Sequence, residues 1–176
     1  MLIILDRDGV INHDSDFYIK SVDEWQPIEG SIEAIAALKQ AGHSVAVATN
    51  QSGLARGYYT LGTLNAMHAK MQQLLQPFNT QVDYIAYCPH GPDDVCSCRK
   101  PLTGMLEAIA QQFNSPKAEI MMIGDSISDY QAASAFGIEY LQVLTGKGER
   151  TVASGKLPSH IKIYSDLRVA VQALLS

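Results

Sequence analysis

The chain has 176 residues, of which 47% are hydrophobic and 18% charged, and this composition is typical of one globular domain with its own core. The formal net charge of -5 offers no broad positive field to nucleic acid, so we expect no such partner and a local cluster of cations for any anionic substrate. The apolar run at residues 2–5 is too short for a signal peptide or a membrane span. We therefore expect a cytoplasmic protein without a membrane partner.

Short apolar segments alternate with amphipathic segments along the chain. Buried strands are predicted over residues 2–5, 44–49, 83–87, 119–123, 139–144 and 161–164. Helices are predicted over residues 31–41, 61–76, 102–113 and 128–136, and a turn over 146–148. Residues 9–30 and 88–101 are irregular and are predicted to be loops. This order favours an α/β fold, a Rossmann-like parallel sheet with helices on both faces.

Polar residues follow the first four predicted strands, at the point where each strand ends. They are Asp6 to Gly9, Thr49 to Ser52, Cys88 to His90, and Gly124 to Ser126. In an open parallel sheet the carboxyl ends of the strands form the edge where ligands bind. The sequence therefore predicts a functional site built from these four segments.

Asp6 and Asp8 are predicted to carry out phosphate chemistry. They are two residues apart just after an extended strand, so both side chains can point to the same side of the chain. At the reference pKa of about 3.9 an aspartate is ionised at neutral pH, so we expect Asp6 to attack phosphorus directly and form an aspartyl phosphate. Crowding by like charge should raise the pKa of Asp8, which would then donate a proton to the leaving alkoxide and later activate water.

Further residues complete this hypothesis. Mg²⁺ held by Asp6 and Asp125 would offset the repulsion between a carboxylate and a phosphate dianion. The Thr49 hydroxyl and the backbone N–H groups that follow it, at Asn50, Gln51 and Ser52, can bind phosphoryl oxygens, and Lys100 supplies positive charge. Taken singly, Asp8-Gly9 is equally a hairpin turn and Asp125 equally a helix N-cap. Their joint occurrence with Thr49 and Lys100 favours the catalytic interpretation.

All three cysteines lie in one short segment together with a histidine. Cys88, His90, Cys96 and Cys98 form C-x-H and C-x-C pairs within eleven residues, a pattern that suits tetrahedral zinc. Four protein ligands leave no open coordination position, so the predicted zinc is structural. Arg99 and Lys100 come directly after the last ligand, and we expect the zinc-binding loop 88–98 to fix these two cations over the phosphate site. The alternative is three reduced thiols and an exposed histidine.

The order of these motifs resembles the haloacid dehalogenase superfamily of phosphohydrolases over most of the chain. The motifs that resemble its D,D-heptose 1,7-bisphosphate phosphatase family are Asp6-Arg7-Asp8-Gly9-Val10-Ile11-Asn12, the segment from Thr49 to Gly57, Cys88-Pro89-His90, and Cys96-Ser97-Cys98-Arg99-Lys100-Pro101. Residues 9–30 and the loop 88–98 are the only insertions near the site and both are short, so we expect a single domain over residues 1–176 without a large cap domain. The resemblance implies removal of the 7-phosphate from the heptose bisphosphate, in nucleotide-heptose synthesis for lipopolysaccharide.

The resemblance also assigns individual roles. It implies Asp6 as nucleophile, Asp8 as proton donor, and Mg²⁺ held by Asp6, the backbone carbonyl of Asp8, and Asp125. It implies that Thr49 and Lys100 stabilise the phosphoryl group. The residues that it assigns to sugar recognition are Arg99, Asp14, Ser15, Asp16 and Phe17. Some relatives carry Lys directly after the metal-binding Asp, whereas this chain has Ser126, with Asp129 one helical turn further on.

Several alternatives stay open at this point. The histidinol-phosphate phosphatases share the nucleophile and the cysteine-rich loop, so this activity, or that of another small phosphomonoester hydrolase, is the nearest alternative. A phosphoacceptor signalling domain is disfavoured because its acceptor Asp lies on a central strand near mid-chain, and a zinc-dependent binding module is disfavoured by the acidic balance. We expect a monomer. The remaining histidines, His13, His43, His68 and His160, are predicted to be surface or helix-end residues.

Overall fold

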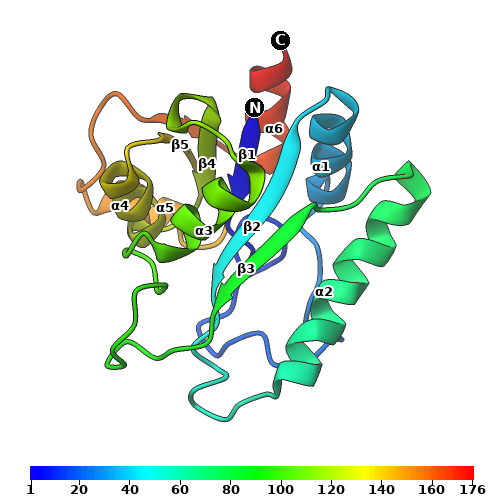
Figure 1. Ribbon diagram of the computed structural model, residues 1–176, viewed down its shortest axis with the longest axis vertical. Coiled ribbons are helices and arrows are strands. Elements are labelled where there is room, and N and C mark those ends of the chain that lie inside the picture. Colours follow the sequence, from blue (N-terminus) through cyan, green and yellow to red (C-terminus); the bar gives the residue numbers. More distant parts are fainter.

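Six parallel strands form the centre of the computed structural model, which describes residues 1–176 (Figure 1). Their order in the sheet is β3-β2-β1-β4-β5-β6. The bounds are β1 Leu2–Leu5, β2 Ser44–Asn50, β3 Tyr84–Cys88, β4 Ile120–Gly124, β5 Glu139–Val143 and β6 Lys162–Tyr164. All six predicted strands are confirmed, and every pair of neighbours is parallel.

Six α-helices connect or follow these strands. They are α1 Ser31–Gln40, α2 Leu61–Leu75, α3 Gly104–Phe113, α4 Ile127–Phe136, α5 Gly148–Ala153 and α6 Leu167–Leu175, with short 3₁₀ turns at Gln76–Phe78 and Lys117–Glu119. The four predicted helices are confirmed. Residues 145–147 form the turn predicted at 146–148, but helix α5, which begins at Gly148, was not predicted. Helix α6 was not predicted, although Asp166 is a recognisable N-cap whose side chain accepts a hydrogen bond from the Val169 N–H.

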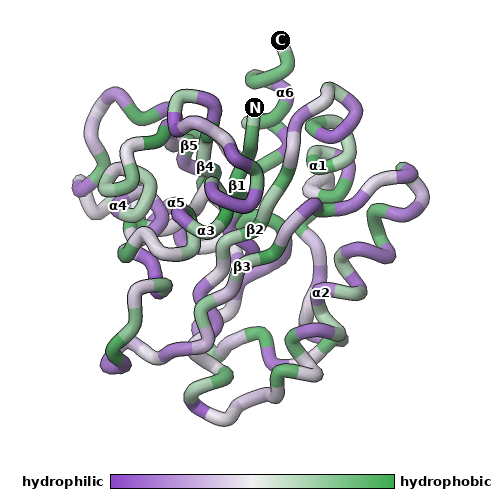
Figure 2. Tube along the Cα trace, in the orientation of Figure 1, coloured by the Kyte–Doolittle hydropathy of each residue, from purple (hydrophilic) through white to green (hydrophobic).

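The core has two halves, one on each face of the sheet. Ile3 and Leu5 point to the half that includes residues of α1, α2 and α6, whereas Leu2 and Ile4 point to the half that includes residues of α3 and α4. This alternation follows from the two-residue period of a strand, and a strand buried on both faces has to be apolar throughout. Figure 2 shows β1 as one of the most hydrophobic parts of the trace. None of the helices combines the length and apolar character that crossing a membrane requires.

Residues 9–30 form a long loop between β1 and α1 that lies over the carboxyl end of the sheet. Trp25 anchors the loop, since its side chain is fully buried in the core half beneath α1 and α2. The Lys70 ammonium of α2 donates to the backbone carbonyls of Val22 (2.9 Å) and Trp25 (2.6 Å). The loop is thus fastened to the domain on its inner side, and its first residues remain beside Asp6 and Asp8.

The strand order reverses between β1 and β4, because the chain runs outward through β2 and β3 on one side and through β5 and β6 on the other. Such a switch point leaves a crevice at the carboxyl ends of the two central strands. Asp6 follows β1 and Asp125 follows β4, and the Asp6 N–H donates to the carbonyl of Ile123 in β4 (3.0 Å). The topology therefore brings these two carboxylates together.

Candidate active site

A cavity of about 270 Å³ opens at this switch point, and its lining is predominantly polar. Every residue predicted from the sequence for catalysis, magnesium or substrate lines it, with the exception of Phe17. These lining residues are Asp6, Asp8, Asp14, Ser15, Asp16, Thr49, Asn50, Gln51, Ser52, Arg99, Lys100 and Asp125. The Phe17 side chain is 81% exposed, and the following residues Tyr18 and Ile19 line the cavity instead.

Asp6 lies at the bottom of the cavity with its carboxylate held in one orientation. Its Oδ1 accepts a hydrogen bond from the Arg7 N–H (2.7 Å) and forms an ion pair with Lys100 Nζ (2.9 Å). Burial and the nearby Asp129 carboxylate raise the pKa of Asp6 to about 7, against the opposing effect of Lys100. In the protein without a metal ion, the pKa of Asp6 therefore lies well above the reference value on which its expected ionisation at neutral pH rests.

Asp8 is surrounded by hydrogen-bond donors. The Arg7 guanidinium donates to both of its oxygens, Asn12 Nδ2 donates to Oδ1 (2.8 Å), and Gln51 Nε2 donates to Oδ2 (2.9 Å). Burial would raise the pKa of Asp8, but Arg7 and these hydrogen bonds outweigh it and hold the pKa below its ordinary value. The prediction of a raised pKa is wrong, because a cation rather than a second carboxylate is its closest partner.

Lys100 is almost completely buried and bridges two carboxylates. Its Nζ lies 2.9 Å from Asp6 Oδ1 and 2.6 Å from Asp129 Oδ1, and it donates to the carbonyl of Ala48 (2.7 Å). The Asn50 side chain fixes the Lys100 backbone by accepting from its N–H (2.9 Å) and donating to its carbonyl (3.0 Å). Asn50 is therefore engaged in holding Lys100 in place.

Asp6, Asp125 and Asp129 form a buried cluster in which carboxylate oxygens from all three lie within 4.8 Å of one another. Burial, Asp6 and Asp129 raise the pKa of Asp125 well above its ordinary range, whereas Lys100 and Ser126 hold that of Asp129 low despite its burial. Crowded carboxylates of this kind are relieved by a hard cation with oxygen ligands. The donor set fits Mg²⁺.

Two glycines leave room for the Asp125 carboxylate. Gly9 has φ of 88° and Gly146 has φ of 59°, a left-handed conformation that favours glycine. A Cβ atom on either residue would collide with the Asp125 side chain. The Lys147 N–H then donates to Asp125 Oδ2 (2.7 Å), so the turn after β5 closes around this carboxylate.

Thr49 and Gln51 lie on the β2 side of the cavity. Thr49 Oγ1 accepts from Gln51 Nε2 (2.8 Å), and Gln51 Oε1 accepts a short hydrogen bond from the Tyr59 hydroxyl. Since the Gln51 amide also donates to Asp8, its side chain connects Asp8 to Thr49 and Tyr59. The Gln51 side chain is thus a bridge between protein groups at the edge of the cavity.

The outer rim combines acidic and basic side chains. Lys147 Nζ lies 3.6 Å from Asp14 Oδ2, and the Arg150 guanidinium lies 3.1 Å from Asp16 Oδ1, so the 9–30 loop meets the start of α5. Arg99 donates to the carbonyl of His90 (3.3 Å). Arg99 and Lys147 both line the cavity and add two further cations to Lys100.

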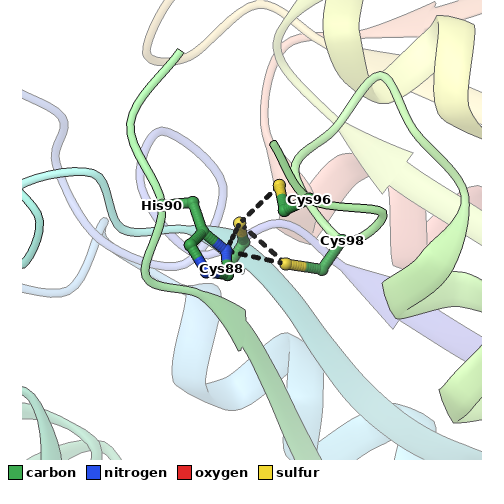
Figure 3. Close-up of side chains that lie close together, drawn as sticks. All are labelled: Cys88, His90, Cys96 and Cys98. Atoms are coloured by element: carbon green, nitrogen blue, oxygen red, sulfur yellow. Dashed lines mark hydrogen bonds between the residues drawn. The ribbon is translucent and has the colours of Figure 1, made fainter. Parts of the chain in front are cut away.

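The four predicted zinc ligands converge on one point (Figure 3), and Arg99 and Lys100, which line the cavity, follow directly after Cys98. The Cys88 and Cys98 sulfurs are 3.0 Å apart, and His90 Nδ1 lies 3.6 Å from Cys88 Sγ and 3.4 Å from Cys98 Sγ. Cys96 Sγ lies 3.9 Å from Cys88 Sγ. Three thiols and one imidazole nitrogen in this arrangement suit zinc, and no disulfide links them.

The structure adds residues that the sequence interpretation had not assigned to the site. Asp129 joins the carboxylate cluster; the only signal for it is its place in a capping box with Ser126, which caps α4. Lys147 follows the fifth strand and so lies outside the four strand ends from which the site is predicted. His68 was predicted to be exposed, and this is wrong: it is 8% exposed and lies 3.3 Å from the Arg7 guanidinium.

Comparison with known proteins agrees with the fold and the site. The haloacid dehalogenase-like hydrolase family matches residues 3–137. The D-glycero-beta-D-manno-heptose-1,7-bisphosphate 7-phosphatases of Pseudomonas aeruginosa and Pseudomonas putida are 55% and 53% identical to this chain, over 99% of it and over 97% and 99% of their own lengths. The chain belongs to the D,D-heptose 1,7-bisphosphate phosphatase family of the haloacid dehalogenase superfamily.

A solved structure also supports the assignment to the superfamily, and its similarity to this chain covers the whole fold. The D,D-heptose 1,7-bisphosphate phosphatase of Bordetella bronchiseptica, solved with magnesium and phosphate, has a TM-score of 0.96 and 50% identity, and the match covers 99% of this chain and 97% of that one. The resemblance predicted from the motifs is confirmed. Magnesium and phosphate in this relative agree with the oxygen-rich cluster and the cations that line the cavity in this member of the family.

Proposed function

We propose that this chain is a magnesium-dependent phosphatase that removes the 7-phosphate from D-glycero-D-manno-heptose 1,7-bisphosphate. The observation that supports it best is the Asp6 carboxylate, oriented by Lys100 at the bottom of a polar cavity that two further cations line. Relatives that are named for this activity share at least half of their residues with the chain over almost its full length. Their names specify the β anomer, which we take as the substrate.

The reaction begins with Asp6. A carboxylate oxygen of Asp6 attacks phosphorus, the bond from phosphorus to the sugar oxygen breaks, and Asp8 donates its proton to that oxygen. Asp8 is ionised in the free protein, and the phosphate dianion that binds beside it raises its pKa and favours the protonated form. Water then attacks the aspartyl phosphate, Asp8 takes its proton, and Asp6 is released together with inorganic phosphate.

The surrounding residues orient the phosphoryl group and balance its charge. Lys100 and the Thr49 hydroxyl lie at the cavity wall next to Asp6, where they can contact phosphoryl oxygens. We propose that Asp6, Asp125 and the Asp8 backbone carbonyl hold Mg²⁺, with Asp129 close enough to join them directly or through water. Bound there, the ion would act as a Lewis acid and offset the negative charges of the carboxylate and the phosphate.

Recognition of the second phosphate is assigned to the rim. Arg99 and Lys147 are the cations that line the cavity besides Lys100, and Asp14, Ser15 and Asp16 offer acceptors to sugar hydroxyls. We propose that Cys88, His90, Cys96 and Cys98 hold a structural zinc that fixes Arg99 through the loop. Contacts to a part of the substrate that does not react can position the part that does.

We propose that residues 1–176 act as one catalytic domain and as a monomer in nucleotide-heptose synthesis for lipopolysaccharide. We also propose a cytoplasmic location, which the three thiols support because they must stay reduced to bind zinc.

A substrate panel tests this proposal. The value of kcat/KM should be highest for the β anomer of the heptose 1,7-bisphosphate, lower for the α anomer, and far lower for hexose monophosphates and histidinol phosphate. Histidinol phosphate as the best substrate would assign the chain to the alternative activity. No turnover of any phosphomonoester in the presence of Mg²⁺ would refute the phosphatase itself.

A further inference from the structure

Arg7, the residue between the two catalytic aspartates, is completely buried and faces Asp8. Its Nε lies 3.1 Å from Asp8 Oδ1, and its Nη2 lies 2.9 Å from Oδ1 and 3.1 Å from Oδ2. The guanidinium therefore spans the whole carboxylate. A planar fork of this kind restricts rotation of the carboxylate, which a point charge such as a lysine ammonium cannot do.

The far side of the Arg7 guanidinium rests on helix α2. Nη1 lies 3.3 Å from His68 Nε2 and 3.8 Å from Met67 Sδ. Burial and the positive charge of Arg7 lower the pKa of His68 to about 4, so the ring is neutral and its Nε2 can accept a hydrogen bond from Arg7. Helix α2 thus holds the guanidinium from behind, about sixty residues away in sequence.

A buried guanidinium is costly unless it is fully paired, and Asp8 is the only carboxylate that Arg7 contacts. The remaining donors to Asp8 come from Asn12 at Oδ1 and Gln51 at Oδ2, and Tyr59 donates to Gln51 in turn. The Asp8 carboxylate is therefore fixed from two sides. A turn after a strand does not require this many hydrogen bonds to one side chain, so a role in holding the Asp8 carboxylate is indicated.

We propose that Arg7 is a positioning residue that sets the orientation of the Asp8 carboxylate for proton transfer, and that His68 is a positioning residue that holds Arg7. This inference rests on the proposed role of Asp8 as proton donor. A misplaced donor slows the release of a sugar alkoxide, which needs the Asp8 proton as its bond to phosphorus breaks. It does not slow the release of p-nitrophenolate, which leaves as a stable anion without a proton.

The test compares these two leaving groups in Arg7→Lys. Single turnovers with enzyme in excess isolate the formation of the aspartyl phosphate from its hydrolysis. Because a misplacement of about 1 Å can cost about 10²-fold, we expect sugar release from the heptose bisphosphate to slow by about 10- to 100-fold. Release of p-nitrophenolate from p-nitrophenyl phosphate should change by no more than about threefold, since it needs no general acid. Arg168→Lys, an exposed substitution of the same kind in α6, is the matched control.

The outcome separates positioning from a purely structural role. Equal slowing of both esters, or no slowing of either, in a folded Arg7→Lys would overturn the inference. If Arg7→Lys does not fold, His68→Leu and His68→Gln decide: Leu should slow sugar release selectively, and Gln, which keeps a neutral acceptor for Arg7, should restore it. Identical behaviour of these two variants would overturn the inference as well.

Asp8→Asn distinguishes this failure from that of the proposed function. A normal rate of sugar release by Asp8→Asn would remove Asp8 as the proton donor and the inference with it. Slow release by Asp8→Asn together with normal release by Arg7→Lys would overturn only the positioning role of Arg7.

Discussion

Lys100 and Asp129 form an ion pair of 2.6 Å in which both side chains are almost inaccessible to solvent. Asp129 belongs to α4 and Lys100 follows the cysteine-rich loop, so the pair connects two elements on the same face of the sheet. The same ammonium lies 2.9 Å from Asp6. Asp129 therefore fixes the cation that orients the proposed nucleophile.

We predict that Lys100→Met lowers both activity and stability. Removing a donor that stabilises developing charge typically costs about 10²- to 10³-fold in kcat. Removing one partner of a buried ion pair costs about 3–5 kcal/mol, because the remaining charges are left uncompensated. Steady-state kinetics and urea denaturation measure the two effects.

The double variant Lys100→Met/Asp129→Asn separates these effects. It removes the charge of Asp129, which Lys100→Met leaves unpaired. The Asn side-chain oxygen can still accept the hydrogen bond from the Ser126 N–H in the capping box of α4. The double variant should regain part of the lost stability without regaining activity. If Lys100→Met has the same unfolding free energy as the wild type, the ion pair between Lys100 and Asp129 does not stabilise the fold. If Lys100→Met has a normal kcat, Lys100 takes no part in the chemistry.

The pKa of Asp6, near 7, predicts a magnesium affinity that depends on pH. The ion binds the ionised carboxylate, so a proton competes with it below the pKa. Affinity should therefore rise by about tenfold between about pH 6 and about pH 8, with proton release at the lower pH. Titration calorimetry in two buffers of different ionisation enthalpy measures both quantities. Asp6→Asn should bind more weakly and with a smaller pH dependence; an unchanged dependence would assign the proton to another group.

His68 predicts a separate effect of pH on stability. Its pKa of about 4 in the folded protein lies below the value of about 6.5 expected after unfolding, so the neutral ring favours folding above about pH 6.5. This contribution is lost as the pH falls toward 4. Between about pH 7.5 and pH 5 the wild type should lose about 2 kcal/mol more unfolding free energy than His68→Gln. Equal losses in urea denaturation would contradict a buried neutral His68.

We predict that zinc bound by the four loop residues Cys88, His90, Cys96 and Cys98 fixes the position of Arg99 more than that of Lys100. Arg99 is bonded to the His90 carbonyl within the loop, whereas Asn50, Ala48 and two carboxylates hold Lys100 independently of it. Cys96→Ala should lose zinc but stay folded. Loss of a hydrogen bond to a charged group costs about 1.5–3 kcal/mol, so KM for the bisphosphate should rise by about 10- to 100-fold.

Ser97→Ala, between two of the cysteines, is the matched control for this variant and should keep zinc and activity. Hydrolysis of p-nitrophenyl phosphate, which offers no second phosphate, should be much less affected by Cys96→Ala. Elemental analysis should find zinc in the wild type. A wild type without zinc, or Cys96→Ala with unchanged KM, would show that the cysteines have no part in substrate binding.

Much of the fold and the site could be predicted from the sequence because the signals are local. The apolar runs are long enough to identify all six strands, and the rule for carboxyl ends of parallel strands brings Asp6, Thr49 and Asp125 to one edge. The spacing of Cys88 to Cys98 is enough to predict their convergence. The catalytic roles assigned to these residues remain predictions.

The remainder depends on contacts between distant segments. Nothing in the periodicity of α2 indicates that His68 lies against Arg7, and Arg7 reverses the expected pKa shift of Asp8 because it folds back onto its neighbour. The short helix α5 follows a glycine turn that resembles a loop in the sequence. Lys147, in contrast, is predictable from the sequence, because the rule that ligands bind at the carboxyl ends of the strands applies equally to β5.

The most direct test of the central claim is to follow the heptose 1,7-bisphosphate by phosphorus NMR with wild type and Asp6→Asn in parallel, both with Mg²⁺. With the wild type the resonance of the 7-phosphate should disappear, inorganic phosphate should appear, and the 1-phosphate should persist; Asp6→Asn should leave both resonances unchanged. Loss of the 1-phosphate instead, or turnover by Asp6→Asn, would contradict the account.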